Sequence, residues 1–302
     1  LNGRPPLYDR AALKLTAEDR ARLEAEGRRP HWRFKLSGRR VEWDDLVRGR
    51  QSIDLSSQSD PVLIRGDGDY LYTLPSVVDD LDFAMSHIIR GEDHVTNTGA
   101  QIEVFEALGG PSPRFGHFPL LAGKDGAKLS KRNGSLSVQD LREGGFEPLA
   151  VLSHLARVGT SDPVAAAHDL EELVAGFAWE KIGRASARFD VDELARVNAQ
   201  VLHASAYGAM KDRLAAFDAD LGEAFWLAVR PNLNVLKDAA VWAQVVQGPV
   251  TPVVGDPGFA EAALSVLPDG PYTPDTWKAF ADAVKDKTGA KGKGLFMPLR
   301  QA

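Results

Sequence analysis

The spacing of hydrophobic and polar residues changes part-way along the chain. Up to about residue 135, apolar positions come in short runs, some alternating with polar positions, and Gly, Pro and Asp separate the runs. That pattern is typical of strands and turns. Beyond it, apolar residues recur every three or four positions, as in helices that bury one face. The sequence therefore predicts a mixed α/β first part followed by an all-α second part.

The first part is expected to open with short elements. A charge-rich run predicts a helix over 17–27, and alternating residues predict a strand over 31–36. Two β-prone runs, 61–65 and 70–74, surround a Gly-Asp-Gly turn. Such a turn between two β-prone runs predicts a hairpin.

A strand followed by a helix is predicted next. Residues 86–91 form an apolar run that a glycine stops, as in a short buried strand. Thr98 and Gln101 have capping-box spacing, which predicts a helix start, and Gly109 with Gly110 predicts its end. Strand, polar loop and helix are half of a βαβ unit, so parallel α/β structure is expected here.

Helical periodicity dominates the second part. A helix is expected to start at Pro148 and stop at Gly159, since proline suits a first turn and glycine a helix end. Further apolar faces recur over 194–201 and 277–284. A break between helical subdomains is expected where three prolines cluster, at Pro249, Pro252 and Pro257.

The composition is that of a globular protein. Of 302 residues, 44% are hydrophobic and 26% charged, and the length allows two or three domains. No window approaches the roughly 18 consecutive apolar residues of a bilayer span. Because the chain begins at Leu1 with no apolar leader, we expect an internal cut, a cytoplasmic location and no membrane partner.

Cysteine is absent, which excludes disulfides and limits any zinc site to His and carboxylate ligands. The seven His residues are scattered, so no zinc is expected. The run 92–94, Glu-Asp-His, has ligand-type side chains, but three adjacent residues on one loop rarely point at one ion. The sequence therefore predicts no metal site.

The charge is unevenly distributed. The formal net charge of −6 argues against a nucleic-acid partner, yet residues 1–50 hold thirteen Lys or Arg against eight Asp or Glu, which is +5. Two more basic stretches lie at 124–132 and 285–293. Each stretch is a candidate for phosphate contact, although any one of them taken alone fits a solvated face better.

A cationic loop framed by glycines is the strongest candidate for chemistry. Between Gly126 and Gly134 the chain carries Lys128, Lys131 and Arg132 with a hydroxyl at Ser130. Glycines allow close approach of the backbone to a ligand, and cations suit the charge that develops when a nucleotidyl group is transferred. Taken alone, the segment fits an exposed basic loop as well.

Four blocks in one order resolve this ambiguity. Residues 128–132, Lys-Leu-Ser-Lys-Arg, resemble the KMSKS signature of class I aminoacyl-tRNA synthetases in its glutamyl form. Residues 77–80 and 88–94 resemble the VVDD and IRGEDH blocks of that family, and 116–121 resemble its HxPLL strand. The chain thus resembles bacterial-type glutamyl-tRNA synthetases over nearly its whole length.

The resemblance implies roles for particular residues. By resemblance, Tyr72, Ser76 and Arg90 would bind glutamate, although many members of the family have Asn at the position of Ser76. Lys128, Ser130 and Lys131 would be the catalytic residues. The family's ATP pocket maps onto Asp93, His94, Leu120, Leu121, Lys128, Leu129, Lys131 and Arg132.

Arg90 also has a physical rationale. It follows an apolar strand at a sheet edge, where ligands usually bind, and a guanidinium can hold a carboxylate with two hydrogen bonds. The alternative role is a salt bridge to Asp79, Asp80 or Glu92. Near the amino terminus, residues 7–11 resemble a segment in which some members place a zinc-binding Cys, but Ala11 or Ala12 stands there, so the resemblance implies no zinc.

The resemblance also defines what is missing. No pair among the seven His residues has the spacing of the family's HIGH motif, so the chain is expected to be truncated at the amino terminus and inactive alone. Residues 292–300 resemble a segment that more helix follows in full-length members, so truncation at the carboxyl terminus is expected as well. The implied fold is multidomain α/β plus all-α, with the second half of a Rossmann-type catalytic domain. The implied domains are an acceptor-end insertion remnant (1–72), that catalytic half (73–115), a stem-contact region (116–205) and a helical anticodon-binding domain (206–302).

The implied reaction is ATP-dependent formation of glutamyl-adenylate and transfer of glutamate to tRNA(Glu), with Mg²⁺ accompanying ATP and tRNA(Gln) left open as a second acceptor. A monomer is expected. A glutaminyl-tRNA synthetase usually ends in β-barrels, against the helical pattern here, and the shortened paralogue that modifies a tRNA base lacks an anticodon-binding region. A non-catalytic tRNA-binding module is the alternative from a different class.

Overall fold

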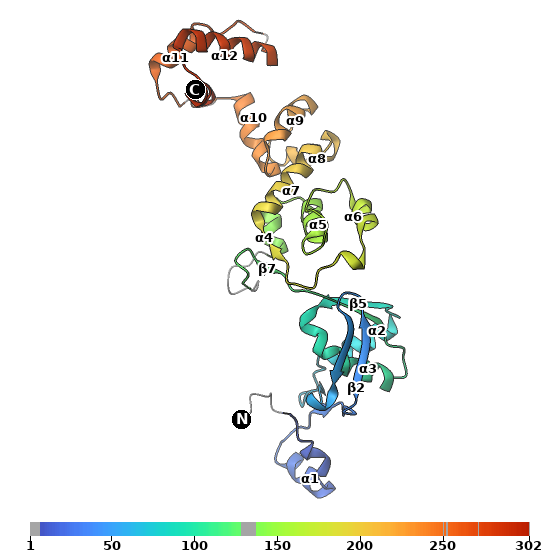
Figure 1. Cartoon of the computed structure of the whole chain (residues 1–302). Coiled ribbons are helices and arrows are strands. Elements are labelled where there is room, and N and C mark those ends of the chain that lie inside the picture. The colour runs from blue at the N-terminus through green and yellow to red at the C-terminus, as the bar shows by residue number, and fades with distance from the viewer. Residues whose placement is uncertain (1–6, 128–136, 250, 252, 271, 302) are drawn as a thin grey trace. The chain divides into compact units, whose positions relative to one another are not determined.

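The structure is a computed structural model that describes residues 7–127, 137–249, 251, 253–270 and 272–301 (Figure 1). Its internal contacts divide the chain into two compact units. Unit 1 comprises 1–206 and 230–236, and unit 2 comprises 207–229 and 237–302.

Unit 1 begins with mixed α/β structure. Its described strands form two-stranded pairs, β1–β4, β2–β3, β5–β6 and β7–β8. The strands are β1 (Trp32–Arg33), β2 (Arg40–Asp45), β3 (Gly49–Asp54), β4 (Val62–Ile64), β5 (His87–Gly91), β6 (Arg114–Phe118), β7 (Ala122–Gly123) and β8 (Arg188–Phe189). The helices of this unit are α1 (Ala17–Ala25), α2 (Thr73–Asp82), α3 (Val95–Ala107), α4 (Val138–Glu143), α5 (Pro148–Arg157), α6 (Leu170–Gly176) and α7 (Val191–Ala204).

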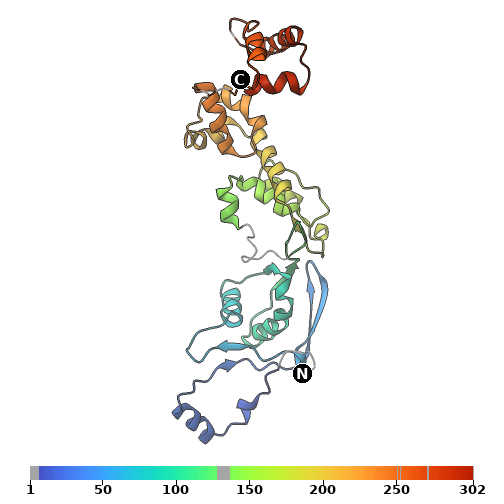
Figure 2. The same ribbon diagram turned by 90° about the vertical axis from the view of Figure 1, so that its left-hand side faces the viewer.

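A parallel β5–α3–β6 unit lies at the centre of this region. β5 and β6 pair in parallel, with Arg90 opposite His117, and α3 connects them. The antiparallel hairpin β2–β3 packs against α3 and β6, and α2 packs against α3 (Figure 2). The predicted strand at 86–91 and the parallel α/β arrangement are therefore confirmed.

One core holds these elements together. Val77 of α2, Phe105 of α3 and Phe115 of β6 are each at most 1% exposed. They pack with buried residues of the hairpin segment, so the hairpin and the parallel β5–α3–β6 unit share a single hydrophobic core. The remaining buried members are Leu36, Val41, Leu55, Ala100, Ile102 and Val104.

Two local predictions are wrong. The run 70–74 is not a strand, because α2 begins at Thr73 and buries Val77; only an isolated bridge from Ile64 to Tyr70 remains, and β4 pairs with β1 instead. Thr98 is not a helix cap either. α3 begins at Val95, so Thr98 lies within it and points its side chain into the protein.

The strand predicted at 31–36 is shortened to Trp32–Arg33. The charged helix predicted at 17–27 is confirmed as α1, and its capping box joins Thr16 to Asp19.

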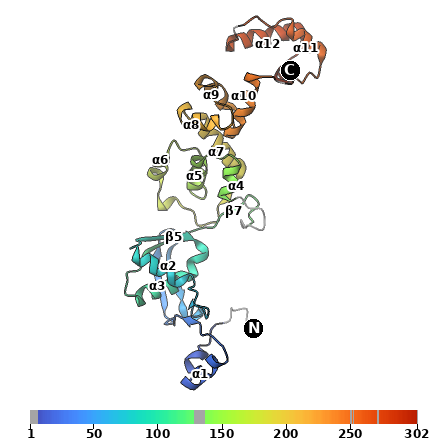
Figure 3. The same cartoon turned by 180° about the vertical axis from the view of Figure 1, so that it is seen from behind.

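The helical part of unit 1 confirms the prediction at Pro148. α5 begins there and packs along α7 (Figure 3), burying Ala150, Leu194 and Val197. Both helices are amphipathic, so each needs the other to cover its apolar face.

His154 of α5 lies fully buried in this contact. Neither ring nitrogen has a hydrogen-bond partner among the described residues. The Phe189 ring packs edge-on at 5.0 Å, and the Glu193 carboxylate is 3.9 Å from Nδ1. Burial lowers the pKa of His154, and the attraction of Glu193 only partly opposes that effect.

This imidazole makes the stability of unit 1 dependent on pH. Since the folded pKa is depressed, the unfolded chain binds the proton more readily, and stability falls as the pH drops below about 6.5. The free energy of unfolding can be measured by urea titration at about pH 8 and about pH 5. Its decrease between these pH values should be smaller for His154→Leu than for the wild type, by on the order of 1 kcal/mol. The exposed His168, changed to Gln, is the control and should behave as the wild type; equal losses in all three proteins would refute the assignment.

Unit 2 is helical in its described residues. It contains α8 (Tyr207–Ala215), α9 (Glu223–Val229), α10 (Ala239–Gln247), α11 (Pro257–Leu264), α12 (Pro274–Thr288) and α13 (Lys293–Gln301). The last three, red in Figure 2, pack together around Ala263, Val284 and Leu295. The predicted helix over 277–284 is confirmed as α12, which Thr273 caps. In the part of the chain that the structure describes, no helix has the length and apolarity to cross a bilayer.

Candidate active site

Arg90 occupies the carboxyl end of β5, with Gly91 completing the strand. Its guanidinium is partly buried, and side chains from three other elements converge on it. Nε donates to His117 Nε2 (3.1 Å) and Nη1 donates to the Tyr72 hydroxyl (3.1 Å). Nη2 donates to Thr98 Oγ1 and to Gln101 Oε1, both at 2.7 Å.

All four of these partners are uncharged acceptors. An arginine has five N–H donors, so one, on Nη1, has no partner among the described residues. Within those residues no carboxylate lies close enough to form an ion pair with Arg90, and the salt bridge considered as its alternative role is not formed. The positive charge is thus held in place but not neutralised, which favours binding of an anion.

The Asp80 carboxyl interacts electrostatically with Arg90 without forming an ion pair with it. Burial raises the pKa of the Asp80 carboxyl, and the charge of Arg90 only partly counters the rise.

Ser76 and Tyr72 lie at the same site. The Gln101 amide donates to Ser76 Oγ at 3.1 Å, so Gln101 joins Ser76 to Arg90. The Tyr72 ring lies 5.4 Å from the His94 ring, and Tyr72 is half exposed. The structure therefore brings Tyr72, Ser76 and Arg90 together as the sequence predicted, with His94 beside them.

Asp93 and Leu120 meet at the next residue of the strand. A Cβ placed on Gly91 would come within 2.5 Å of Asp93 Oδ1 and 3.0 Å of Leu120 Cδ2. A larger residue at 91 would force the Asp93 or Leu120 side chain to move, so glycine lets both lie close to the strand. Leu120 N also donates to Glu92 Oε1 (3.4 Å), and Arg48 pairs with the other oxygen of Glu92 at 2.5 Å.

The cationic loop lies outside the described residues, since Lys128, Leu129, Ser130, Lys131 and Arg132 fall within 128–136. At the start of this basic stretch, Lys124 pairs with Asp190 at 3.0 Å and with Asp192 at 2.7 Å. Lys124 is therefore bound to carboxylates rather than available for phosphate.

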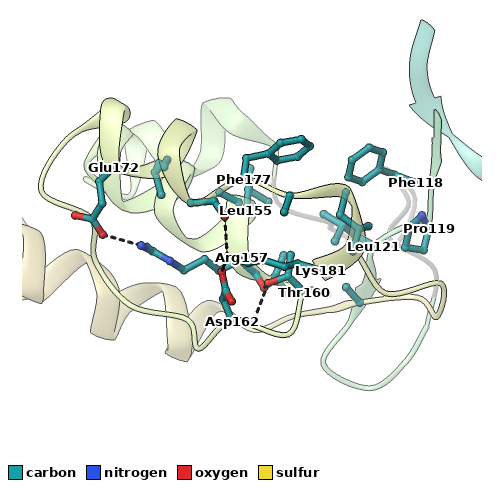
Figure 4. A pocket seen from close by; sticks show the side chains of 18 residues that line it. Phe118, Pro119, Leu121, Leu155, Arg157, Thr160, Asp162, Glu172, Phe177 and Lys181 are labelled. Carbon is teal, nitrogen blue, oxygen red and sulfur yellow. Dashed lines mark hydrogen bonds and ion pairs between the residues drawn. The ribbon is translucent and has the colours of Figure 1, made fainter. Parts of the chain in front are cut away.

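Leu121 faces a separate cavity of about 320 Å³ (Figure 4). Its walls are mainly apolar and include Phe118 and Phe177. Its charged groups pair with each other, Arg157 with Glu172 and Lys181 with Asp162, as the dashed lines show. Arg90 and Tyr72 do not line it. The cavity suits an uncharged apolar group and is distinct from the anion-binding site.

Four residues of the Arg90 site escaped the sequence analysis. Thr98 and Gln101 carried a signal, since they are polar residues one turn apart inside an apolar helix, but the capping-box pattern hid it. His117 lay within a quoted motif, yet its contact with Arg90 depends on strand pairing. Asp45, which bonds to His117, is 72 residues away in the chain and carried no signal.

No group of three or more metal-ligating side chains gathers among the described residues. The expectation of no zinc therefore stays a prediction, and no residue can be named as a metal ligand.

Comparison with known proteins identifies the class. Residues 2–202 match the family described as "tRNA synthetases class I (E and Q), catalytic domain". That match spans most of the chain, including the β5–α3–β6 unit and the Arg90 site. The chain therefore belongs to the class I tRNA synthetase family.

Within that family its relatives are glutamate–tRNA ligases. The chain is 60% identical to glutamate–tRNA ligase 1 of Maricaulis maris over 99% of its length, and 58% identical to glutamate–tRNA ligase 2 of Hyphomonas neptunium over 99%. It spans 67% and 68% of those proteins. A crystal structure of a glutamate tRNA ligase from Elizabethkingia meningosepticum with its amino acid matches with a TM-score of 0.73 at 22% identity, covering 96% of this chain and 65% of that one, which supports the fold.

Proposed function

We propose that this chain carries the amino-acid-binding part of a glutamate–tRNA ligase and that Arg90 binds the side-chain carboxylate of glutamate. The observation that supports this most is the state of the guanidinium: it is fixed by four neutral acceptors, bears an unneutralised charge and keeps one N–H without a protein partner among the described residues. An anionic ligand completes such a site, whereas a neutral glutamine amide gains no charge pairing.

The proposed reaction has two steps. In the first, the α-carboxylate of glutamate attacks the α-phosphorus of ATP, an acyl-phosphate bond forms and the α–β phosphoanhydride breaks, releasing pyrophosphate. In the second, a terminal ribose hydroxyl of tRNA attacks the acyl carbon, an ester forms and AMP leaves. Glutamate held by Arg90, Tyr72 and Ser76 would be aligned for the first step.

The other residue roles are part of the same proposal. Lys128 and Lys131, with Ser130, would stabilise the phosphate charge as pyrophosphate leaves, and Mg²⁺ would accompany ATP. Asp93, His94, Leu120, Leu129 and Arg132 would contribute to the ATP pocket, whereas Leu121, predicted for the same pocket, lines the separate apolar cavity. The adjacency of Asp93 and Leu120 at Gly91, immediately after Arg90, supports one continuous pocket for both substrates.

We further propose that the helical carboxyl-terminal part binds tRNA(Glu) and that the protein acts as a monomer in the cytoplasm, where translation takes place. Its basic stretch at 285–293 supports contact with phosphates. This part would recognise tRNA mainly through its shape, base stacking and contacts with the phosphate backbone.

Exchange of labelled pyrophosphate into ATP tests the proposal. The complete product of the gene, supplied with tRNA, should show exchange with glutamate and none above background with glutamine. The isolated 302 residues contain no His pair with HIGH spacing and should show none. Absence of exchange in the complete product, with tRNA still bound, would favour the non-catalytic tRNA-binding alternative.

A further inference from the structure

Asp45 and His117 form a fully buried pair behind Arg90. Both side chains are 0% exposed, and Asp45 Oδ2 lies 2.5 Å from His117 Nδ1. Asp45 Oδ1 accepts backbone N–H bonds from Val47 (3.1 Å), Arg48 (3.0 Å) and His117 (3.1 Å). The carboxylate is therefore fixed by the backbone on one oxygen and directed at the imidazole with the other.

The hydrogen bonds determine which ring nitrogen carries the proton. Arginine can only donate, so His117 Nε2, which receives Arg90 Nε–H, must present its lone pair. The proton of a neutral imidazole then lies on Nδ1 and is donated to Asp45. Thr98 Oγ1 lies 3.1 Å from the same Nε2, and its hydroxyl has the His94 carbonyl oxygen as an acceptor at 3.2 Å, so it does not need the lone pair that Arg90 uses.

His117 is neutral near physiological pH. Burial lowers the pKa of His117; the bond from Asp45 opposes this, and the charge of Arg90 adds to the lowering. For Asp45, burial alone would raise the pKa, but the hydrogen bonds from Arg48, His117 and Val47 outweigh it and hold the pKa below its usual value. The pair is thus a carboxylate beside a neutral ring.

We propose that Asp45 and His117 are positioning residues for Arg90: Asp45 fixes the tautomer of His117, and His117 holds the Nε side of the guanidinium so that Nη1 faces the glutamate carboxylate. The inference rests on the proposed function of Arg90. Asp45 ends β2, in the hairpin that forms part of the predicted acceptor-end insertion, so this insertion builds part of the amino-acid site.

Asp45→Asn changes the tautomer at almost constant shape. The amide oxygen can keep the backbone N–H bonds, but the amide NH₂ then faces Nδ1 and makes it an acceptor, which moves the ring proton to Nε2. Nε2–H and Arg90 Nε–H would oppose each other as two donors. We expect the KM for glutamate in pyrophosphate exchange by the complete gene product to rise about tenfold or more, with the KM for ATP within about twofold.

Asp60→Asn is the matched control. Asp60 is buried like Asp45, each residue being 4% exposed as a whole, and lies in the same predicted insertion, but it binds Arg10 and the backbone of Leu36 rather than the Arg90 site. It should lower stability without changing the KM for glutamate. His117→Gln, which offers an amide oxygen to Arg90, should retain more glutamate affinity than His117→Leu, which offers none.

Nitrogen NMR of labelled histidine in the complete protein reads the tautomer directly. Wild type should show His117 protonated at Nδ1, and Asp45→Asn should show it at Nε2. A wild-type proton on Nε2, or a glutamate KM equal in the wild type and Asp45→Asn, would overturn the proposal; the first of these decides the matter even if Asp45→Asn fails to fold. A wild type that does not activate glutamate at all would instead reject the proposed function.

Discussion

Arg90→Lys should lower kcat/KM for glutamate in pyrophosphate exchange by about 10²- to 10³-fold. Lysine keeps the charge, but its single nitrogen cannot reach His117, Tyr72, Thr98 and Gln101 together while presenting a planar edge to a carboxylate. The loss should appear mainly in the KM for glutamate, with the KM for ATP little changed.

Arg114→Lys is the control for this substitution. Arg114 is exposed on β6, the strand paired with the one that carries Arg90, but it has no contact with the site among the described residues. It should leave the kinetics near wild type. If Arg90→Lys kept wild-type kcat/KM, the guanidinium would not be the group that recognises glutamate.

Lys131→Gln should reduce kcat for pyrophosphate exchange by about 10²- to 10⁴-fold while changing the KM for glutamate little. The reason is that charge accumulates on the departing pyrophosphate in the transition state, so a cation that meets it there accelerates the step without contributing to amino-acid binding.

Lys124→Gln provides the comparison. This lysine belongs to the same basic stretch but is paired with Asp190 and Asp192, so its loss should change kcat by no more than about threefold. If both substitutions lowered kcat equally, the basic stretch would act through its total charge or through folding rather than through Lys131 itself.

Local patterns predicted the fold where one element could be recognised from its own residues. The apolar run before Gly91 predicted β5, Pro148 marked the start of α5, and the apolar spacing over 277–284 predicted α12. The strand prediction at 70–74 was wrong because the chain turns into helix α2 at Thr73. The helix is favoured since it buries Val77 against α3, which a hairpin strand would not do.

The site was predicted only in part, because most of it depends on contacts distant in sequence. Arg90 could be found from its place after a strand and from family resemblance. Its neutral surroundings could not, since they combine Tyr72 at the start of α2 with side chains of α3 and β6. The Asp45–His117 bond, which joins the hairpin to β6, spans 72 positions. Thr98 shows the limit of short motifs: its spacing to Gln101 fits a capping box, but both side chains bind Arg90 instead.

The most direct measurement is a crystal structure of the complete gene product with a non-reactive analogue of glutamyl-adenylate. The account predicts that the side-chain carboxylate of the analogue lies about 2.7–2.9 Å from Nη1 of Arg90, as in charge-assisted hydrogen bonds, with Lys131 in the same cleft. A carboxylate bound away from Arg90, or Arg90 and Lys131 in separate clefts, would contradict it.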